Sequence, residues 1–262
     1  MKIACQIVRG PEHAECEDHA LVCQPGNPAG SQVLNVFRGE LTAEIPGVFA
    51  VADGVGGNPG GHEASGFVLR DLMEKAKELK LSSDDKEAEK TLQDLIRTLN
   101  ADLVSQAQKT PGKEIMATTF TALFMNEGGA WYLHTGNTRL QVMSGIFIKQ
   151  ITSDHTTYQW LMDSGAFEAA EHCNRCEIQS CLGAGSPRYL TRINAKRFRE
   201  AGDLAGVYLL SSDGIHEYTS ADFMEEIMGR DDISDLEKTD AIIAEARKNG
   251  SLDDTTIMII RV

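Results

Sequence analysis

The sequence lacks any apolar run close to the roughly 18 residues that a membrane-spanning helix needs. Its N-terminus also lacks the long apolar core of a secretory signal peptide, because Arg9 interrupts the first apolar stretch. We therefore expect a soluble, cytoplasmic protein. Thiols in that compartment are kept reduced, so the six cysteines are expected to be free rather than paired in disulfides.

Positive charge is scarce: 25 Lys and Arg stand against 39 Asp and Glu, which gives a net charge of −14. Nucleic acids and anionic membrane surfaces attract basic faces, so neither is an expected partner. The acidity serves solubility in any case, and it also allows carboxylates to be grouped for cation binding. No pattern in the sequence specifies an oligomeric state.

Cysteines with metal-ligand spacing are few. Cys173 and Cys176 form a single CxxC, preceded by His172. A structural zinc site usually takes four well-spaced ligands, commonly as two such pairs. We interpret these cysteines as packed or loop thiols, with a zinc or redox site as the minor alternative.

The 262 residues and a hydrophobic content of 42% fit a single domain over 1–262. Apolar runs predict strands at 47–52, 118–125, 130–135, 139–143, 147–151, 207–210 and 257–262. Three-to-four spacing predicts helices over 64–79 and 92–103, and a capping box at 234–237 begins a third that ends at Gly250. Such blocks of strands and helices favour α+β layers. Residues 82–90 are predicted to be an exposed connection, and 163–187 a long irregular stretch of a kind that is usually functional.

Acidic residues stand beside turn residues at the ends of five predicted strands. The pairs are Glu17-Asp18, Asp53-Gly54, Asp154-His155, Asp213-Gly214 and Asp253-Asp254. Any one of them alone reads as an ordinary turn. Together they offer the carboxylate and carbonyl oxygens that suit Mg²⁺ and Mn²⁺. Two such ions roughly 3.5–4 Å apart can acidify a water for attack on phosphorus.

Five segments resemble the motifs of the metal-dependent protein phosphatases, the type-2C serine/threonine family, and they follow the family's order. VFAVADGVGG at 48–57 resembles its Asp-Gly-x-Gly-Gly hallmark, and ATTFT at 117–121 with LHTGNTRL at 133–140 resembles its central hairpin. ITSDH at 151–155, YLLSSDG at 208–214 and SLDDTT at 251–256 resemble the remaining motifs. The resemblance implies a four-layer αββα sandwich, with two antiparallel sheets face to face and helices outside.

The resemblance also implies a site for two Mn²⁺ or Mg²⁺ ions. Asp53 would bridge both ions, the carbonyl of Gly54 would contact one, and Asp213 and Asp253 would hold the other. Of Glu17 and Asp18, we favour Asp18 as the residue that reaches the ions, mostly through water. The implied reaction is hydrolysis of phosphoserine or phosphothreonine in a phosphorylated protein substrate by a metal-bridging hydroxide, with Asp53, Asp213 and Asp253 as the catalytic set. The stretch at 163–187 would be a flap beside the site.

Three positions depart from the family pattern. Asn137 stands where a carboxylate normally helps to bind a third ion, so we do not expect a firmly held third ion. The family's phosphate-clamping Arg, five residues before the first Asp, is here His13, with Arg9 nearby; both are candidate phosphate-binding residues and both could equally be exposed surface. Asp254 follows Asp253 where Asn is common.

Two other functions compete with the phosphatase reading. A catalytically silent module would keep the fold and bind metal or phosphopeptide without turnover, which Asn137 and the missing Arg would permit. A hydrolase of small phosphoesters is the weaker option, since an acidic surface repels acidic phosphopeptides. Assays on both kinds of substrate separate these readings.

Overall fold

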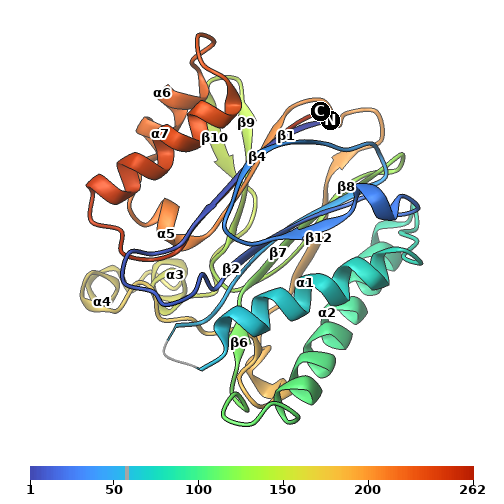
Figure 1. The fold of residues 1–262 in the computed structure, drawn as a ribbon, viewed down its shortest axis with the longest axis vertical. Helices are drawn as coiled ribbons and strands as arrows, with labels where there is room; N and C mark the ends of the chain where they lie inside the picture. The colour runs from blue at the N-terminus through green and yellow to red at the C-terminus, as the bar shows by residue number, and fades with distance from the viewer. Residues whose placement is uncertain (57–58) are drawn as a thin grey trace.

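A computed structural model describes residues 1–56 and 59–262. Its core is two six-stranded antiparallel sheets packed face to face, with helices on both outer faces (Figure 1). One sheet has the order β10-β9-β13-β14-β1-β4, and the other has the order β12-β8-β7-β5-β2-β3. The predicted four-layer αββα sandwich is confirmed. Gly57, the last glycine of the hallmark motif, lies outside the described residues.

The first sheet is formed by β1 (Lys2–Val8), β4 (Phe37–Thr42), β9 (Arg139–Ser144), β10 (Phe147–Gln150), β13 (Val207–Ser211) and β14 (Thr255–Arg261). The second is formed by β2 (Asp18–Cys23), β3 (Gln32–Leu34), β5 (Gly47–Asp53), β7 (Phe120–Asn126), β8 (Gly129–Thr135) and β12 (Asn194–Glu200). A short pair joins β6 (Ala117–Thr118) to β11 (Leu182–Gly183). The helices are α1 (Gly61–Ala76), α2 (Asp85–Ala107), α3 (Thr157–Asp163), α4 (Phe167–His172), α5 (Asp213–His216), α6 (Ala221–Met228) and α7 (Asp235–Lys248), with 3₁₀ turns at Pro28–Gly30 and Pro187–Tyr189.

Continuous apolar runs become strands that are buried on both faces. In β5, Ala50 and Ala52 pack with α1 and α2, whereas Phe49 and Val51 face the opposite sheet. In β14, Ile257 and Ile259 likewise face α5–α7, whereas Met258 and Ile260 face the other sheet. Because side chains alternate along a strand, only a run that is apolar at every position can fill the layer on each side.

Several predicted elements differ from the structure. The connection predicted at 82–90 is shorter, because α2 begins at Asp85 with Asp84 as its N-cap. The irregular stretch at 163–187 contains α4 and β11. The elements that were not predicted are β1, β3, β4, β12, α3, α5 and α6. The capping box of α7 is confirmed, with Ser234 and Glu237 bonding each other's backbone N–H groups.

Four of the five acidic pairs meet because strands from both sheets end at the same edge of the sandwich. Asp18 begins β2 and Asp53 ends β5, both in one sheet. Asp213 follows β13 and Asp253 precedes β14, both in the other. Among the residues that the structure describes, no helix combines the length and apolar character needed to cross a membrane.

Candidate active site

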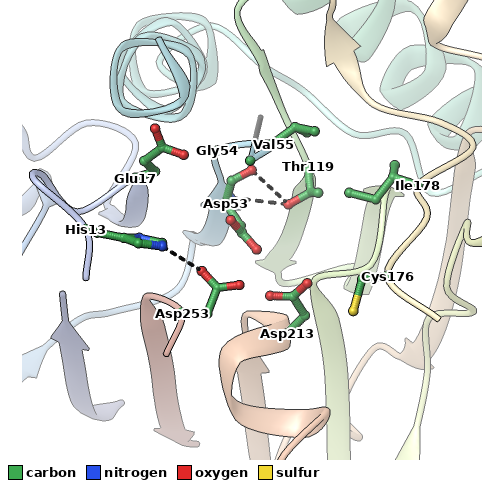
Figure 2. Close-up of a pocket in the computed structure, with 11 residues that line it drawn as sticks. His13, Glu17, Asp53, Gly54, Val55, Thr119, Cys176, Ile178, Asp213 and Asp253 are labelled. Carbon is green, nitrogen blue, oxygen red and sulfur yellow. Dashed lines mark hydrogen bonds and ion pairs between the residues drawn. The ribbon is translucent and has the colours of Figure 1, made fainter. Parts of the chain in front are cut away.

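A pocket of about 380 Å³ opens between the ends of the two sheets (Figure 2). Its lining consists of His13, Glu17, Asp53, Gly54, Val55, Gly56, Thr119, Cys176, Ile178, Asp213 and Asp253. Figure 2 shows the carboxylates of Asp53, Asp213 and Asp253 pointing toward one another. The structure therefore brings together four of the predicted metal-site residues, these three and Gly54.

Asp53 ends a strand that the neighbouring backbone holds in place. Its carbonyl oxygen accepts hydrogen bonds from Thr119 N at 2.8 Å and from Thr118 Oγ1 at 2.8 Å. Gly54 follows at a point of close approach: a Cβ there would lie 2.6 Å from Gly61 and 2.8 Å from Glu17. Only glycine fits, which explains the Asp-Gly pair in packing terms rather than as a simple turn.

Asp18 lies behind the pocket instead of lining it. Its Oδ2 accepts hydrogen bonds of 2.7 Å from Ser212, which follows β13, and from Thr256 of β14, both on the side of the opposite sheet. Its Oδ1 is buried without a hydrogen-bond partner. Of the two acidic neighbours, it is Glu17 that lines the pocket.

Asp213 begins the short helix α5 directly after β13. Asn137, in the turn between β8 and β9, donates a hydrogen bond of 2.8 Å from Nδ2 to Asp213 Oδ2. Asp213 Oδ1 is buried and unpartnered. Gly214 is required by packing, since a Cβ there would lie 1.9 Å from the carbonyl oxygen of Asp254.

The turn before β14 has one exposed and one buried carboxylate. Asp253 is 46% exposed and faces the pocket. Asp254 is buried and accepts backbone hydrogen bonds from Gly10 N at 2.7 Å and Glu17 N at 2.6 Å. Arg247 of α7 supports the same turn, donating to the carbonyl of Asp253 at 2.6 Å. The turn and the loop after β1 are thus fixed to each other.

That loop brings His13 to the pocket, where Nε2 lies 3.9 Å from Asp253 Oδ1 and Nδ1 lies 3.1 Å from Asp254 Oδ2. Burial lowers the pKa of His13, but the hydrogen bond and charge of Asp254 outweigh it and leave the pKa above its ordinary value. Arg9 does not line the pocket formed by the described residues. Its guanidinium donates instead to the carbonyl of Ala14 at 2.8 Å.

Crowded carboxylates dominate the electrostatics. Burial, together with the charges of Asp18 and Asp213, raises the pKa of Asp53 well above its usual range. Burial and the charge of Asp253 raise the pKa of Asp213 to about 6. Burial raises the pKa of Glu17 to about 6 and that of Asp18 to about 8. Carboxylates that resist ionisation this strongly are stabilised by a cation placed among them.

The donor set suits hard divalent ions. It consists of carboxylates, and two of them, Asp18 and Asp213, each keep a buried oxygen with no hydrogen-bond partner. Such orphaned oxygens are costly to bury unless something binds them. Among the described residues, two groups of side chains have possible metal-ligand atoms within 4.8 Å of one another. One is His13–Asp253–Asp254, at the edge of this site, and the other is Asp154–His216–Glu217.

The other acidic pair, at Asp154, lies in a separate cluster. Arg139 donates to Asp154 Oδ1 from Nε at 3.0 Å and to Oδ2 from Nη2 at 2.5 Å. Glu217 lies 3.7 Å from the same guanidinium. The guanidinium of Arg139 supplies the positive charge in this cluster, so Asp154 is paired with the start of β9 and takes no part in the pocket that the described residues line.

Comparison with known proteins identifies the chain. A sequence model described as protein phosphatase 2C matches residues 40–230. The chain belongs to the protein phosphatase 2C family. It is 26% identical over 216 residues to the serine/threonine phosphatase stp of Listeria innocua, covering 81% of this chain and 83% of that one.

Solved structures agree with this assignment of the phosphatase fold. Stp1 from Staphylococcus aureus superposes with a TM-score of 0.78 at 23% identity, covering 99% of this chain and 94% of that one. The catalytic domain of PstP, in complex with two manganese ions, gives 0.71 at 23% identity, covering 99% and 98%. The predicted fold and the predicted enzyme class, a protein serine/threonine phosphatase, are confirmed.

Several residues of this phosphatase site were not singled out from sequence. Ser212 and Thr256 lie within the motifs at 208–214 and 251–256, and their place in those motifs was the signal that could have identified them. Thr119 lies likewise within the central hairpin motif. Cys176 and Ile178 come from the stretch at 163–187, and no local pattern marks them as pocket residues.

Proposed function

We propose that this phosphatase 2C chain hydrolyses phosphoserine and phosphothreonine in proteins with the help of two divalent ions, Mn²⁺ or Mg²⁺. The convergence of Asp53, Asp213 and Asp253 from two sheets carries the proposal. Bound ions would supply the positive charge that acidifies water and polarises the phosphoryl group. The manganese complex of the similar PstP domain supports this choice of metal.

The roles of the residues follow from their positions. Asp53, central among the carboxylates, is the proposed bridge between the ions, with the carbonyl of Gly54 beside it. Asp213 and Asp253 are the proposed ligands on the side of the other sheet. Asp18 has its unpartnered Oδ1 behind the pocket, from where it would reach the ions through water.

Residues at the rim of the pocket are proposed to position the substrate. His13 projects from the loop after β1 and is the proposed donor to a phosphoryl oxygen, in the place where the family has an arginine. Arg9 is the weaker candidate for this role because its guanidinium is already bonded within the loop. The stretch at 163–187 contributes Cys176 and Ile178 to the opposite wall, which supports its proposed role as a flap.

The test is phosphate release from a phosphothreonine peptide with EDTA, Mg²⁺ or Mn²⁺, for the native chain and for Asp213→Ala. Metal-dependent release that falls by roughly 10²-fold or more in the variant is expected, because a charge-stabilising group is lost. Asp94→Ala, on the exposed face of α2, is the matched control and should retain full activity. Phosphopeptide binding without release under any metal would instead favour a silent module.

A further inference from the structure

An apolar groove of about 280 Å³ adjoins the acidic pocket. Its lining residues are Val55, Ile115, Ile178, Cys181, Ala184 and Tyr189. Val55 and Ile178 also line the acidic pocket, so the two hollows share a wall. Ile115 and Tyr189 stand 47% and 54% exposed, so both side chains are accessible to a partner.

The groove is fixed to the strand that bears Asp53. Strand β6 pairs with β11, and Thr118 of β6 also forms a bridge with Gly54. Val55 N donates to the carbonyl of Ala117 at 3.0 Å, and Ala184 N donates to that of Met116 at 3.0 Å. These contacts hold the Val55 and Ala184 side of the groove against the strand that carries Asp53.

We infer that this groove binds an apolar side chain of the protein substrate, within two residues of the phosphorylated one. The inference rests on the proposed function, which places the phosphoryl group among the carboxylates. An extended chain advances about 3.3 Å per residue, so a segment leaving the pocket on the side of Val55 and Ile178 immediately meets the groove. An apolar residue there loses contact with water, whereas a polar one must give up hydrogen bonds with water.

Charge argues for the same occupant. The chain carries a net charge of −14, which disfavours a substrate segment rich in carboxylates. The lining of the groove can instead make apolar contacts with a side chain of the substrate. The groove thus assigns a substrate class: phosphorylated segments with an apolar flanking residue.

The experiment compares kcat/KM for matched phosphothreonine peptides with Leu or Ser at positions −2, −1, +1 and +2. The native chain should prefer leucine at one or two of these positions by about tenfold, the lower range for an apolar contact in a pocket. Ile115→Ser and Tyr189→Ser should bring that ratio close to one. Ile146→Ser is the control: this side chain is 71% exposed in the β9–β10 turn, away from the groove, and the ratio should stay at its native value.

Other results would overturn the inference. An unchanged leucine preference in both groove variants places the selectivity elsewhere. A native dimer that becomes a monomer with Ile115→Ser, as measured by sedimentation, makes the groove an interface between two copies of the chain. Failure of the native chain to hydrolyse p-nitrophenyl phosphate with Mn²⁺ contradicts the proposed function instead, because that substrate has no chain to enter the groove.

Discussion

Asp18 and Asp53 lie directly opposite each other in the antiparallel pair β2–β5. Side chains in such a pair share one face of the sheet, with Cβ atoms about 4.5–5.5 Å apart, and like charges there are destabilising. The main-chain register therefore forces two carboxylates together. Burial raises the pKa of Asp18 to about 8 despite hydrogen bonds from Thr256 and Ser212.

The first prediction concerns stability against pH in EDTA. Since the pKa of Asp18 is about 8 in the folded state and about 4 when unfolded, the folded state holds an extra proton between these values. Folding stability should then fall as pH rises from 6.5 to 8, by up to about 1.4 kcal/mol per pH unit. Urea unfolding at several pH values measures this.

The buried histidines do not contribute to the change in folding stability between pH 6.5 and 8. Burial lowers the pKa of His19 and His155 to about 4 and places those of His134 and His216 well below the usual range. A group with a lowered pKa costs stability only when pH falls below its unfolded value near 6.5. Asp53 and His13 also have raised pKa values, so their contributions to stability are lost in the same direction as pH rises. Asp18→Asn should therefore reduce the slope above pH 6.5 without removing it, and an unaltered slope would contradict the assignment to Asp18.

The second prediction concerns Asn137. Its hydrogen bond lowers the pKa of Asp213, so Asn137→Ala should raise that pKa further and weaken Mn²⁺ binding at pH 7. The loss of one hydrogen bond corresponds to roughly 3- to 10-fold in affinity. Asn137→Asp should also raise the pKa of Asp213, since it places a like charge beside that carboxylate. It should nevertheless strengthen Mn²⁺ binding and bind a further ion, because it restores a carboxylate ligand. Titration calorimetry with Mn²⁺ distinguishes the two, and equal affinities in all three proteins would rule out this role.

The third prediction separates His13 from Arg9. His13→Ala should weaken inhibition by inorganic phosphate about tenfold or more, as expected for loss of a hydrogen bond from a charged donor. Arg9→Ala should change the inhibition constant less, because Arg9 is bonded to Ala14 outside the pocket. A larger effect from Arg9 would mean that the loop rearranges when phosphate binds.

The fourth prediction concerns Asp254. Both of its oxygens accept backbone N–H bonds, and asparagine would place an amide donor against one of those N–H groups. Asp254→Asn should lower the free energy of unfolding by about 1–3 kcal/mol. Asp240→Asn is the control: its ion pair with Arg38 is exposed, and its loss should cost less than about 1 kcal/mol. Equal effects in urea unfolding would contradict a special role for Asp254.

Sequence reasoning succeeded where local pattern decides the structure. The apolar run ending at Asp53 had to be a strand buried on both faces. β12 was missed because it is an edge strand rich in Lys and Arg, with only Ala195 buried among its residues. The short helices α3 and α4 have too few turns to show a periodic apolar face.

The residues of the site also divide into those that a local motif reveals and those that only the folded structure reveals. Asp53, Asp213 and Asp253 are found from motifs, because each stands at a strand end with its own local signal. The function of Asp254 depends on backbone groups 237 and 244 residues away in the chain. No local pattern records such a contact, so only the folded structure reveals it.

The origin of the carboxylates in two different sheets has a mechanical consequence. Asp18 and Asp53 belong to one sheet, whereas Asp213 and Asp253 belong to the other. An ion shared between them would join the two sheets at this edge, in addition to side-chain packing and the hydrogen bonds from Ser212 and Thr256 to Asp18. The distances between the carboxylates of the site would then depend on how the two sheets pack against each other. A substitution deep in the layer between them, such as at Phe49 or Tyr208, could therefore alter the chemistry without touching the pocket.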